Sequence, residues 1–242
     1  MGAAMVRTGD YQTVLLIGTE KLHHVTDFTD RTTCVLFGDG AGAVVLEATE
    51  EPVGLLASDL GIDGSVAHIL EVPVDGTHGN HEPVPPSMCA INMEGQEVFR
   101  RAVTKMGESA ATSLKKAGLG LEDVDLLIPH QANVRIIDAT ARRLGIDSSK
   151  VYVNIHSYGN TSSATIPVAL TEAIEDGRVA PGSIIVFAAF GAGLTWASAV
   201  LRWGSRVTPL GESDAELPPT ELTTMELLQS NFDFYGLPEK LT

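Results

Sequence analysis

The sequence predicts a mixed α/β fold, and three observations lead to that class. Short apolar runs alternate with longer stretches of helical periodicity, above all from residue 95 onward. Polar residues follow directly after several apolar runs, as they do where the strands of an open sheet end. Apolar residues make up 44% of the chain and glycine occurs 24 times, which suits a packed core with tight turns. With 242 residues, the chain can form one large domain or two small ones.

The first part of the chain is predicted to be the end of one α/β unit. Residues 1–8 have the character of the last turns of a helix, which Gly9 ends. Strand-like runs follow at 13–19, 33–37, 43–46 and 53–58. Because no opening strands precede this helix, we expect an incomplete unit with unpaired sheet edges, and poor solubility of the isolated chain. Residues 71–86, rich in proline and glycine, are predicted to be a surface loop.

Residues 95–203 are predicted to form a second, complete unit. Apolar residues recur at helical spacing over 95–117, which indicates a long amphipathic helix. The predicted elements after it are strand 125–129, helix 133–144, strand 151–154, helix 161–176, and strands 183–190 and 194–203. The chain is therefore divided into 1–65, a connecting region at 66–94, the unit 95–203, and an acidic, mostly mobile tail at 204–242. This tail can dock on the domain or on a partner, and its residues 220–230 can form a short helix.

Composition excludes several classes of function. The formal charge of −15 argues against nucleic acid or an anionic membrane as the main partner. No apolar run reaches about 18 residues, so no membrane span is predicted. No secretory signal is recognisable, and Cys34 and Cys89 offer neither a disulfide framework nor metal-ligand spacing. We expect a cytoplasmic protein without a metal.

Two glycine-rich segments are predicted to be turns. Residues 37–43, Phe-Gly-Asp-Gly-Ala-Gly-Ala, lack the Lys-Ser/Thr of a phosphate-binding loop, and a strand follows where a dinucleotide fold needs a helix. A tight turn between strands is the better interpretation, since glycine tolerates positive φ and close backbone approach. Residues 190–196 are predicted to form the hairpin turn between the last two strands.

Two polar segments carry the main functional signal. His130 and Asn133 follow the apolar run 124–128, and Asn160 follows the run 151–154. Side chains at the carboxyl ends of strands line the active-site crevice of an open sheet, so we expect His130 and Asn160 to reach one cavity. Both donate hydrogen bonds from neutral side chains, which suits a developing oxyanion such as a thioester enolate. The alternative is a structural role, which is common for a single histidine after a strand.

Arginines gather on two predicted helices. Arg135, Arg142 and Arg143 fall on one side of helix 133–144, and Arg100 lies near the start of helix 95–117. In so acidic a chain they form either a solvated helix face or a docking patch for an acidic partner or phosphorylated carrier. Neither cysteine is favoured as a nucleophile, because Cys34 lies in an apolar run and Cys89 has no obvious base nearby in sequence.

Together, these segments resemble β-ketoacyl-acyl-carrier-protein synthase III, the initiating condensing enzyme of type II fatty acid synthesis, which has a thiolase-like fold. Order and spacing agree over about residues 1–203. The matching segments are Thr29-Asp-Arg31, Phe37-Gly-Asp-Gly-Ala-Gly42, Asn92-Met-Glu-Gly-Gln-Glu-Val-Phe99, Pro129-His-Gln-Ala-Asn133, Tyr158-Gly-Asn-Thr-Ser162 and Phe190-Gly-Ala-Gly-Leu-Thr-Trp196. The resemblance implies a layered α-β-α-β-α arrangement, with the N-terminal of two repeats truncated and the C-terminal repeat complete.

The resemblance implies a Cys-His-Asn mechanism with no cofactor. A cysteine thiolate takes an acyl group from acyl-CoA, and the amide of Ala192 joins the oxyanion hole of this step. His130 and Asn160 then hold the thioester carbonyl of malonyl-acyl-carrier protein while carbon dioxide leaves, because decarboxylation places negative charge on that oxygen. The resulting carbanion attacks the acyl-enzyme.

The same resemblance implies binding surfaces. The residues at the entrance for coenzyme A and pantetheine would be Arg31, Gly95, Phe99, Ala132, Asn133 and Arg135. The residues that meet the acidic carrier protein would be Arg100, Arg135, Arg142 and Arg143. The complete enzyme is expected to be a homodimer.

One departure from the family pattern concerns the nucleophile. The family's cysteine begins the helix whose end corresponds to residues 1–8, so it belongs upstream of Met1, and this chain alone is expected to be inactive. Three hypotheses follow: the C-terminal portion of a synthase III, a non-catalytic subunit that pairs with a cysteine-bearing chain, or a relative with other chemistry, such as an acyltransferase or a polyketide starter enzyme.

Overall fold

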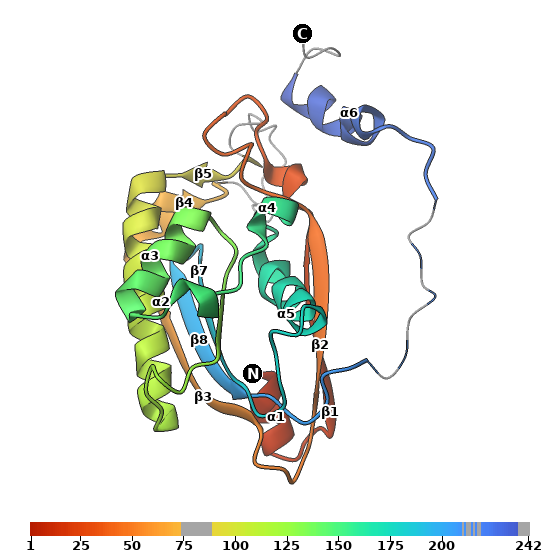
Figure 1. The fold of residues 1–242 in the computed structure, drawn as a ribbon. Coiled ribbons are helices and arrows are strands. Elements are labelled where there is room, and N and C mark those ends of the chain that lie inside the picture. Colours follow the sequence, from red (N-terminus) through yellow and green to blue (C-terminus); the bar gives the residue numbers. More distant parts are fainter. Residues whose placement is uncertain (74–88, 210, 212–213, 215, 217–218, 237–242) are drawn as a thin grey trace.

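The computed structural model describes residues 1–73, 89–209, 211, 214, 216 and 219–236. Its centre is a four-stranded sheet in the order β3 (Gly54–Ile62), β8 (Thr195–Arg202), β7 (Ile184–Gly191) and β6 (Leu126–Pro129). Two helices, α2 (Gly95–Ala117) and α3 (Val134–Leu144), cover one face, and α5 (Thr165–Glu175) covers the other (Figure 1). Beyond α5 lies an antiparallel ribbon of β1 (Thr13–Glu20) and β2 (Gly40–Glu47). The layers are thus helices, sheet, helix and ribbon.

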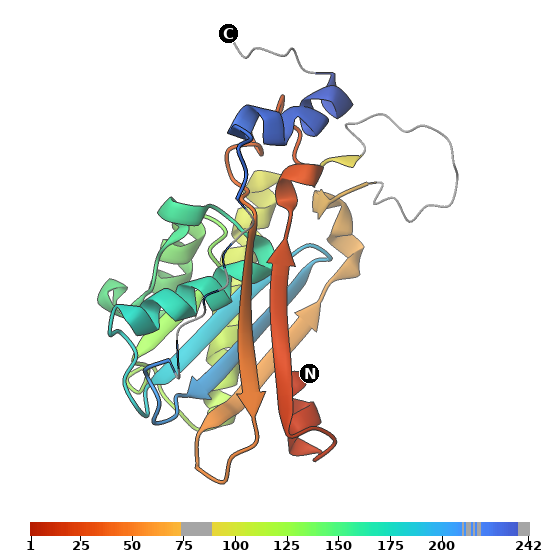
Figure 2. The same ribbon diagram turned by 90° about the vertical axis from the view of Figure 1, so that its right-hand side faces the viewer.

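The sheet joins distant parts of the chain. β6 and β7 pair in parallel, whereas β7 with β8 and β8 with β3 pair antiparallel. The predicted division at residue 65 therefore cuts across a sheet, because β3 pairs with β8 over 54–62. Figure 2 shows this sheet behind the β1–β2 ribbon, with the two sets of strands crossing. The carboxyl ends of β6 and β7 meet at the same edge, which is where the site forms.

Local sequence explains where the helices beside the sheet begin and end. The Asn133 side chain accepts a hydrogen bond from the Arg135 backbone N–H and so caps the start of α3. Both α2 and α3 end at a left-handed glycine, Gly118 and Gly145, where a side chain would be strained. The predicted helices 95–117 and 133–144 are confirmed to within one residue.

Core residues lie on both faces of the four-stranded sheet. The larger cluster joins α2 and α3 to the sheet and includes Met106, Leu127 and Val186, all fully buried. The smaller cluster lies under α5 and includes Leu126, Ile128 and Ile185. Alternate residues of β6 therefore enter opposite cores, which explains why that strand is apolar without interruption.

Two predicted strands are wrong, and side-chain hydrogen bonds explain both. Residues 33–37 form turns because the Asp30 carboxylate accepts hydrogen bonds from the backbone N–H and hydroxyl of Thr32, at 2.9 and 2.7 Å, and from the Thr33 hydroxyl at 2.9 Å. Residues 151–154 make only one bridge, Val151 with Leu127. The Gln131 amide group occupies the neighbouring positions, since it donates to the Tyr152 carbonyl and accepts from the Asn154 N–H.

The glycine-rich segment 37–43 is also not a tight turn. Gly40 and Gly42 lie inside β2, and their φ angles are outside the left-handed region. A Cβ at Gly42 would lie 2.8 Å from Pro167 Cγ, and one at Gly38 would lie 2.3 Å from the Tyr158 carbonyl oxygen. These glycines therefore allow β2 to approach α5 and the segment before it.

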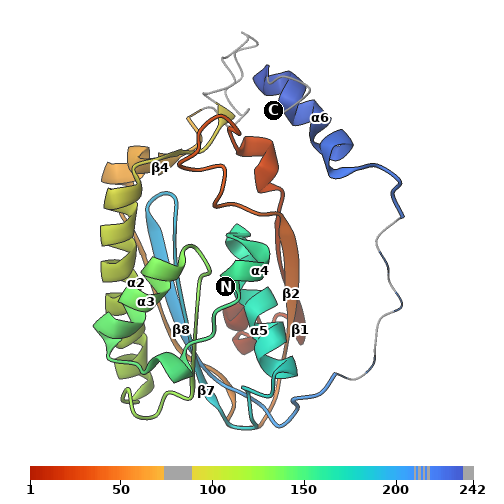
Figure 3. The same ribbon diagram turned by 45° about the horizontal axis from the view of Figure 1, so that its top comes forward.

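The remaining elements are α6 and several short ones. They are α1 (Gly2–Arg7), β4 (Leu70–Glu71), β5 (Asn92–Met93), α4 (Ile155–Tyr158), α6 (Thr224–Tyr235) and the 3-10 helices η1 (Leu22–Val25), η2 (Gly64–Ile69), η4 (Ser148–Lys150) and η5 (Ser162–Ala164). The predicted loop 71–86 lies mostly outside the described residues. The predicted helix in the tail is displaced toward the C-terminus, to α6. Because Phe232 of α6 is only 2% exposed, this part of the tail packs on the fold (Figure 3).

Candidate active site

A cavity of about 1180 Å³ opens at the edge of the sheet where β6 and β7 end. The segment between β1 and β2 forms one wall through Leu22, Thr32 and Phe37, and α2 forms another through Val98 and Phe99. The turn between β7 and β8 contributes Ala192. Residues from both halves of the chain thus enclose one space, which the linear sequence does not reveal.

His130 follows β6 directly and lines this cavity. Its backbone N–H donates to the Ala188 carbonyl at 2.8 Å, which extends the β6–β7 pairing by one residue. Its ring atom Nδ1 lies 2.6 Å from the hydroxyl of Thr165, in the first turn of α5. Burial lowers the pKa of His130 from its usual 6.5 to about 4, because removing the ring from water disfavours the charged form. The imidazole is therefore neutral near pH 7.

Asn160 lines the same cavity, and its side-chain orientation is fixed. The backbone N–H of Ser162 donates to Asn160 Oδ1 at 2.9 Å. The backbone of Asn160 pairs with the end of the segment between β1 and β2: its N–H donates to the Leu36 carbonyl, and its carbonyl accepts from the Gly38 N–H. Because the oxygen is occupied, the amide nitrogen is the atom left to donate into the cavity.

Other predicted site residues divide into two groups. Ala192 and most of the predicted entrance residues line the cavity; these are Gly95, Phe99, Ala132, Asn133 and Arg135. Arg31 does not line it, although its neighbour Thr32 does. The structure thus brings together all but one of the residues predicted for catalysis and for the entrance.

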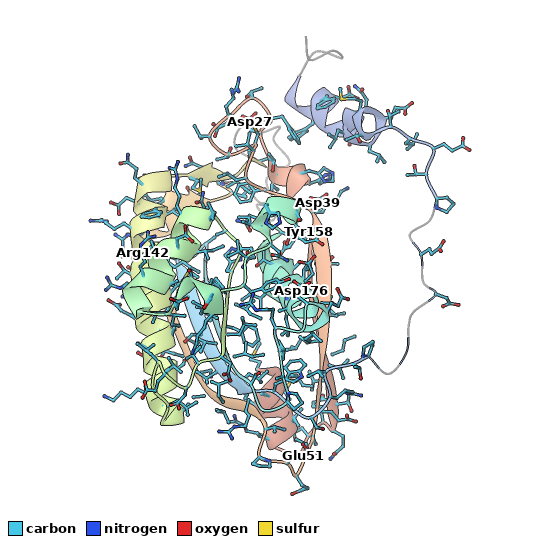
Figure 4. All side chains as sticks on the ribbon, in the orientation of Figure 1. Asp27, Asp39, Glu51, Arg142, Tyr158 and Asp176 are labelled. Atoms are coloured by element: carbon cyan, nitrogen blue, oxygen red, sulfur yellow. The ribbon has the colours of Figure 1, made fainter. Side chains whose placement is uncertain are left out.

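The four arginines predicted to meet a partner differ in their surroundings. Arg100 donates to both Glu97 oxygens at 2.7 Å, and Arg143 lies 3.5 Å from Glu108. Arg135 and Arg142 are exposed and make no ion pair with the described residues. Figure 4 shows Arg142 on the outer side of α3, away from the sheet. The free positive charge of this helix therefore lies at Arg135 and Arg142.

Sequence reasoning missed Thr165 and Ser162, which hold the two central side chains. Ser162 has one recognisable signal, since an Asn side chain commonly accepts from the backbone N–H two residues later. Thr165 carries no such signal, because it meets His130 across 35 residues of sequence. Both cysteines are half-buried, and neither lines the cavity within the described part of the chain.

The layered α/β fold, which presents a half-buried histidine and an asparagine to one cavity, places the chain in the thiolase-like class, as its fold neighbours do. Family models agree: residues 1–64 match 3-oxoacyl-[acyl-carrier-protein (ACP)] synthase III, and residues 114–203 match the C-terminal part of the same family. The chain belongs to the 3-oxoacyl-[acyl-carrier-protein] synthase III family.

Curated relatives include beta-ketoacyl-[acyl-carrier-protein] synthase III 2 of Vibrio cholerae serotype O1, 47% identical over 224 residues, or 93% of this chain and 62% of the relative. Beta-ketoacyl-[acyl-carrier-protein] synthase III of Desulfitobacterium hafniense is 52% identical over 206 residues, or 84% of this chain and 62% of the relative. The chain therefore spans a little over three fifths of the length of these relatives.

Solved structures give the same result. The 3-oxoacyl-[acyl-carrier-protein] synthase III of Aquifex aeolicus VF5 superposes with a TM-score of 0.75 at 45% identity, covering 83% of this chain and 61% of that one. The synthase III of Thermus thermophilus gives a TM-score of 0.77 at 44% identity, covering 85% and 63%. Within the described residues, every helix is too short or too polar to cross a membrane.

Proposed function

We propose that this chain forms the decarboxylation half of a β-ketoacyl-acyl-carrier-protein synthase III site. In the complete protein, an acyl-CoA starter and malonyl-acyl-carrier protein condense to begin fatty acid synthesis. The observation that carries this proposal is the shared cavity of His130 and Asn160, with the Asn160 oxygen already occupied by Ser162. Family membership supports the choice of reaction, since the relatives carry that name.

The physical argument concerns where charge develops. Loss of carbon dioxide from a malonyl thioester places negative charge on the thioester oxygen. Two donors fixed by the fold stabilise that charge without reorganising water, and removing one such donor typically costs about 10²–10³ in rate. A neutral imidazole is suitable because it donates a hydrogen bond without delivering a proton, and the lowered pKa of His130 keeps the ring neutral.

The acyl-holding half requires a thiol. No cysteine lines the cavity among the described residues, so we propose that the thiolate comes from a segment outside this sequence. The amide of Ala192, in the β7–β8 turn at the cavity, serves as the oxyanion donor for that step. In this proposal His130 and Asn160 act on the malonyl thioester and Ala192 acts on the acyl thioester.

The first experiment follows carbon dioxide release and product formation from acyl-CoA and malonyl-acyl-carrier protein. The protein used is this chain joined to the thiol-bearing segment. We expect His130→Ala and Asn160→Asp each to lower decarboxylation by about 10²–10³. His156→Ala is the matched control, because His156 is exposed outside this cavity, and we expect no change. Absence of condensation product from the completed protein would overturn the proposal.

We propose that the acidic carrier protein docks on α3 near the cavity, through Arg135 and Arg142 above all. Arg100 and Arg143 contribute less, because acidic neighbours partly neutralise them. Arg142→Glu should raise KM for the malonyl carrier protein with little change in kcat, and more so at low salt. Arg100→Glu should raise KM less; an equal rise would contradict the greater share given to Arg142.

We also propose that the complete enzyme is a homodimer in the cytoplasm.

A further inference from the structure

The hydrogen bond between His130 and Thr165 determines which ring nitrogen can act on substrate. Nδ1 of His130 lies 2.6 Å from Thr165 Oγ1, and the described residues give neither ring nitrogen another partner. Thr165 is 3% exposed, so water does not compete freely for this contact. The position of one proton in this pair therefore decides whether Nε2 carries a hydrogen.

The Thr165 hydroxyl has one hydrogen and two neighbouring acceptors. One is His130 Nδ1 at 2.6 Å, and the other is the Ser162 carbonyl oxygen at 2.9 Å. The Ser162 carbonyl already accepts the backbone N–H of Thr165. Suppose that the neutral ring carries its hydrogen on Nε2 and the hydroxyl turns away. The half-buried Nδ1 then has no hydrogen-bond partner among the described residues. Two facts favour donation to Nδ1: its distance to the hydroxyl is shorter, and no other donor in the described part of the chain reaches it, whereas the Ser162 carbonyl already has one.

We propose that Thr165 is a positioning residue that donates its hydroxyl hydrogen to Nδ1 and so holds neutral His130 in the form with hydrogen on Nε2. This inference rests on the proposed function, because only that form lets a neutral His130 donate to a thioester oxygen. The opposite arrangement would leave a bare Nε2, which accepts hydrogen bonds and cannot stabilise an enolate. Thr165 contacts His130 and does not itself line the cavity.

The test measures the tautomer directly by ¹⁵N–¹H correlation spectra of the imidazole in this chain, near pH 7. His130→Gln identifies the signal of His130 by its loss. We expect hydrogen on Nε2 in the parent and in Thr165→Ser, which keeps the hydroxyl. In Thr165→Val, which keeps the shape but loses the hydroxyl, the Nδ1–H form should appear. An Nδ1–H tautomer in the parent, or no change in Thr165→Val, would overturn the proposal.

Kinetics in the completed protein provide a second readout. Thr165→Val should lower kcat for decarboxylation at least about tenfold with little change in KM, and Thr165→Ser should restore it. A merely structural role would not produce this pattern of loss and rescue. Because the spectra need no turnover, they can support the tautomer even if the condensation assay fails, which keeps the two proposals separable.

A second, independent observation concerns α6 and the mouth segment, which we define as residues 22–37. α6 lies outside both ranges matched by the family models. A capping box between Thr223 and Glu226 begins the helix, and Phe232 packs edge to face on Phe28 with ring centres 6.1 Å apart. Figure 2 shows α6 lying across this segment at one end of the molecule. The match to the Vibrio cholerae relative covers 93% of this chain and must therefore extend beyond residue 203 into the tail. The match to the Desulfitobacterium hafniense relative covers 84% and need not.

The mouth segment needs such support because little regular structure holds it. It contains the 3-10 helix η1, turns, and a single bridge at Phe37. Five of its residues nevertheless line the cavity, namely Leu22, Val25, Thr32, Leu36 and Phe37. Local hydrogen bonds to Asp30 and backbone bonds such as that from the Asn160 N–H to the Leu36 carbonyl hold the segment, so its conformation depends on loop contacts more than on strand pairing. The buried Phe232 supplies one such contact from outside the segment.

We infer that α6 stabilises the conformation of the mouth segment through the Phe28–Phe232 contact. The cavity is thereby kept in the shape that binds a coenzyme A thioester. This inference also rests on the proposed function for the identity of the ligand. The helix acts on the wall of the cavity, and none of its described side chains lines that cavity. Its effect should therefore appear in substrate affinity and in the motion of residues 22–37.

The test compares Phe232→Ala with Leu227→Ala, an exposed residue of the same helix. Hydrogen–deuterium exchange in this chain should become faster over residues 22–37 in Phe232→Ala and stay unchanged in Leu227→Ala. In the completed protein, Phe232→Ala should raise KM for acyl-CoA several-fold. Unchanged exchange over 22–37 would overturn the inference whether or not coenzyme A binds. Phe28→Ala should reproduce the exchange result, and adding it to Phe232→Ala should cause little further change.

Discussion

The two sets of strands in this molecule are covered very differently. Both faces of the β3-β8-β7-β6 sheet carry helices, and its residue Leu127 is fully buried. The β1–β2 ribbon packs on α1, η5 and α5 through one face only. Its other face presents Leu15, Ile17 and Val45, with Ile17 64% exposed. The ribbon has the apolar pattern of a covered sheet, but the described residues cover one side of it.

This difference shows that an apolar residue in a strand can have either of two roles, packing in a core or forming an exposed apolar surface. In β6 an apolar residue contributes to stability, because removing it leaves a cavity in a packed core. On the outer face of the ribbon an apolar residue forms part of an exposed surface of the kind that binds another surface or aggregates. The two side chains proposed to be catalytic lie next to the covered sheet and its helix, since His130 continues β6 and Asn160 precedes α5.

The largest effect should come from the covered sheet. Leu127→Ala should lower the free energy of unfolding by about 2–5 kcal/mol, since it removes a fully buried side chain between α2 and the sheet. Ile17→Ala on the ribbon is the control and should stay within about 0.5 kcal/mol. Chemical denaturation of both variants measures the difference. Equal losses would show that the ribbon face is buried in solution.

The second-largest effect should be a pH dependence of stability that comes from His130, at the end of the covered sheet. Its pKa in the folded chain, about 4, is below the usual 6.5, so the unfolded chain binds a proton first as the pH falls. The associated stability is complete above about pH 6.5 and is lost as the pH falls toward 4, for a total of about 3 kcal/mol. Denaturation between pH 7 and 4, compared with His130→Gln, isolates this contribution. Parallel curves for the two proteins would refute the burial effect.

A smaller effect is expected where the ribbon meets α5. Gly42→Ala should destabilise the fold by about 1–3 kcal/mol, because the new methyl group would lie 2.8 and 2.9 Å from two carbons of Pro167. Gly204→Ala is the matched control, since nothing lies within 4 Å of that position. Thermal unfolding of the pair measures the effect. A stabilised Gly42→Ala would mean that β2 does not pack closely on α5.

The smallest effect on stability should come from the outer face of the ribbon. Ile17→Lys should change the free energy of unfolding by no more than about 0.5 kcal/mol, and it should raise the solubility of the isolated chain by breaking the apolar patch. Light scattering at increasing protein concentration tests this. A large loss of stability would place this face in an interface.

The sequence by itself determined the elements whose signals are local. Helix α2 followed from its periodicity, and the position of His130 after β6 followed from an apolar run that ends in a polar motif. These signals need only neighbouring residues, because helix periodicity, capping and strand ends are short-range properties. The resemblance of the motifs then predicted the family.

Only the tertiary structure decided which distant groups meet. It paired β3 with β8, replaced a predicted strand at 151–154 by bonds to the Gln131 amide, and used Gly42 for close packing instead of a turn. It also placed Thr165 on His130 and Phe232 on Phe28. The physical reason is that each of these contacts depends on the three-dimensional path of the chain, and contacts between residues tens of positions apart leave no periodic mark in either segment.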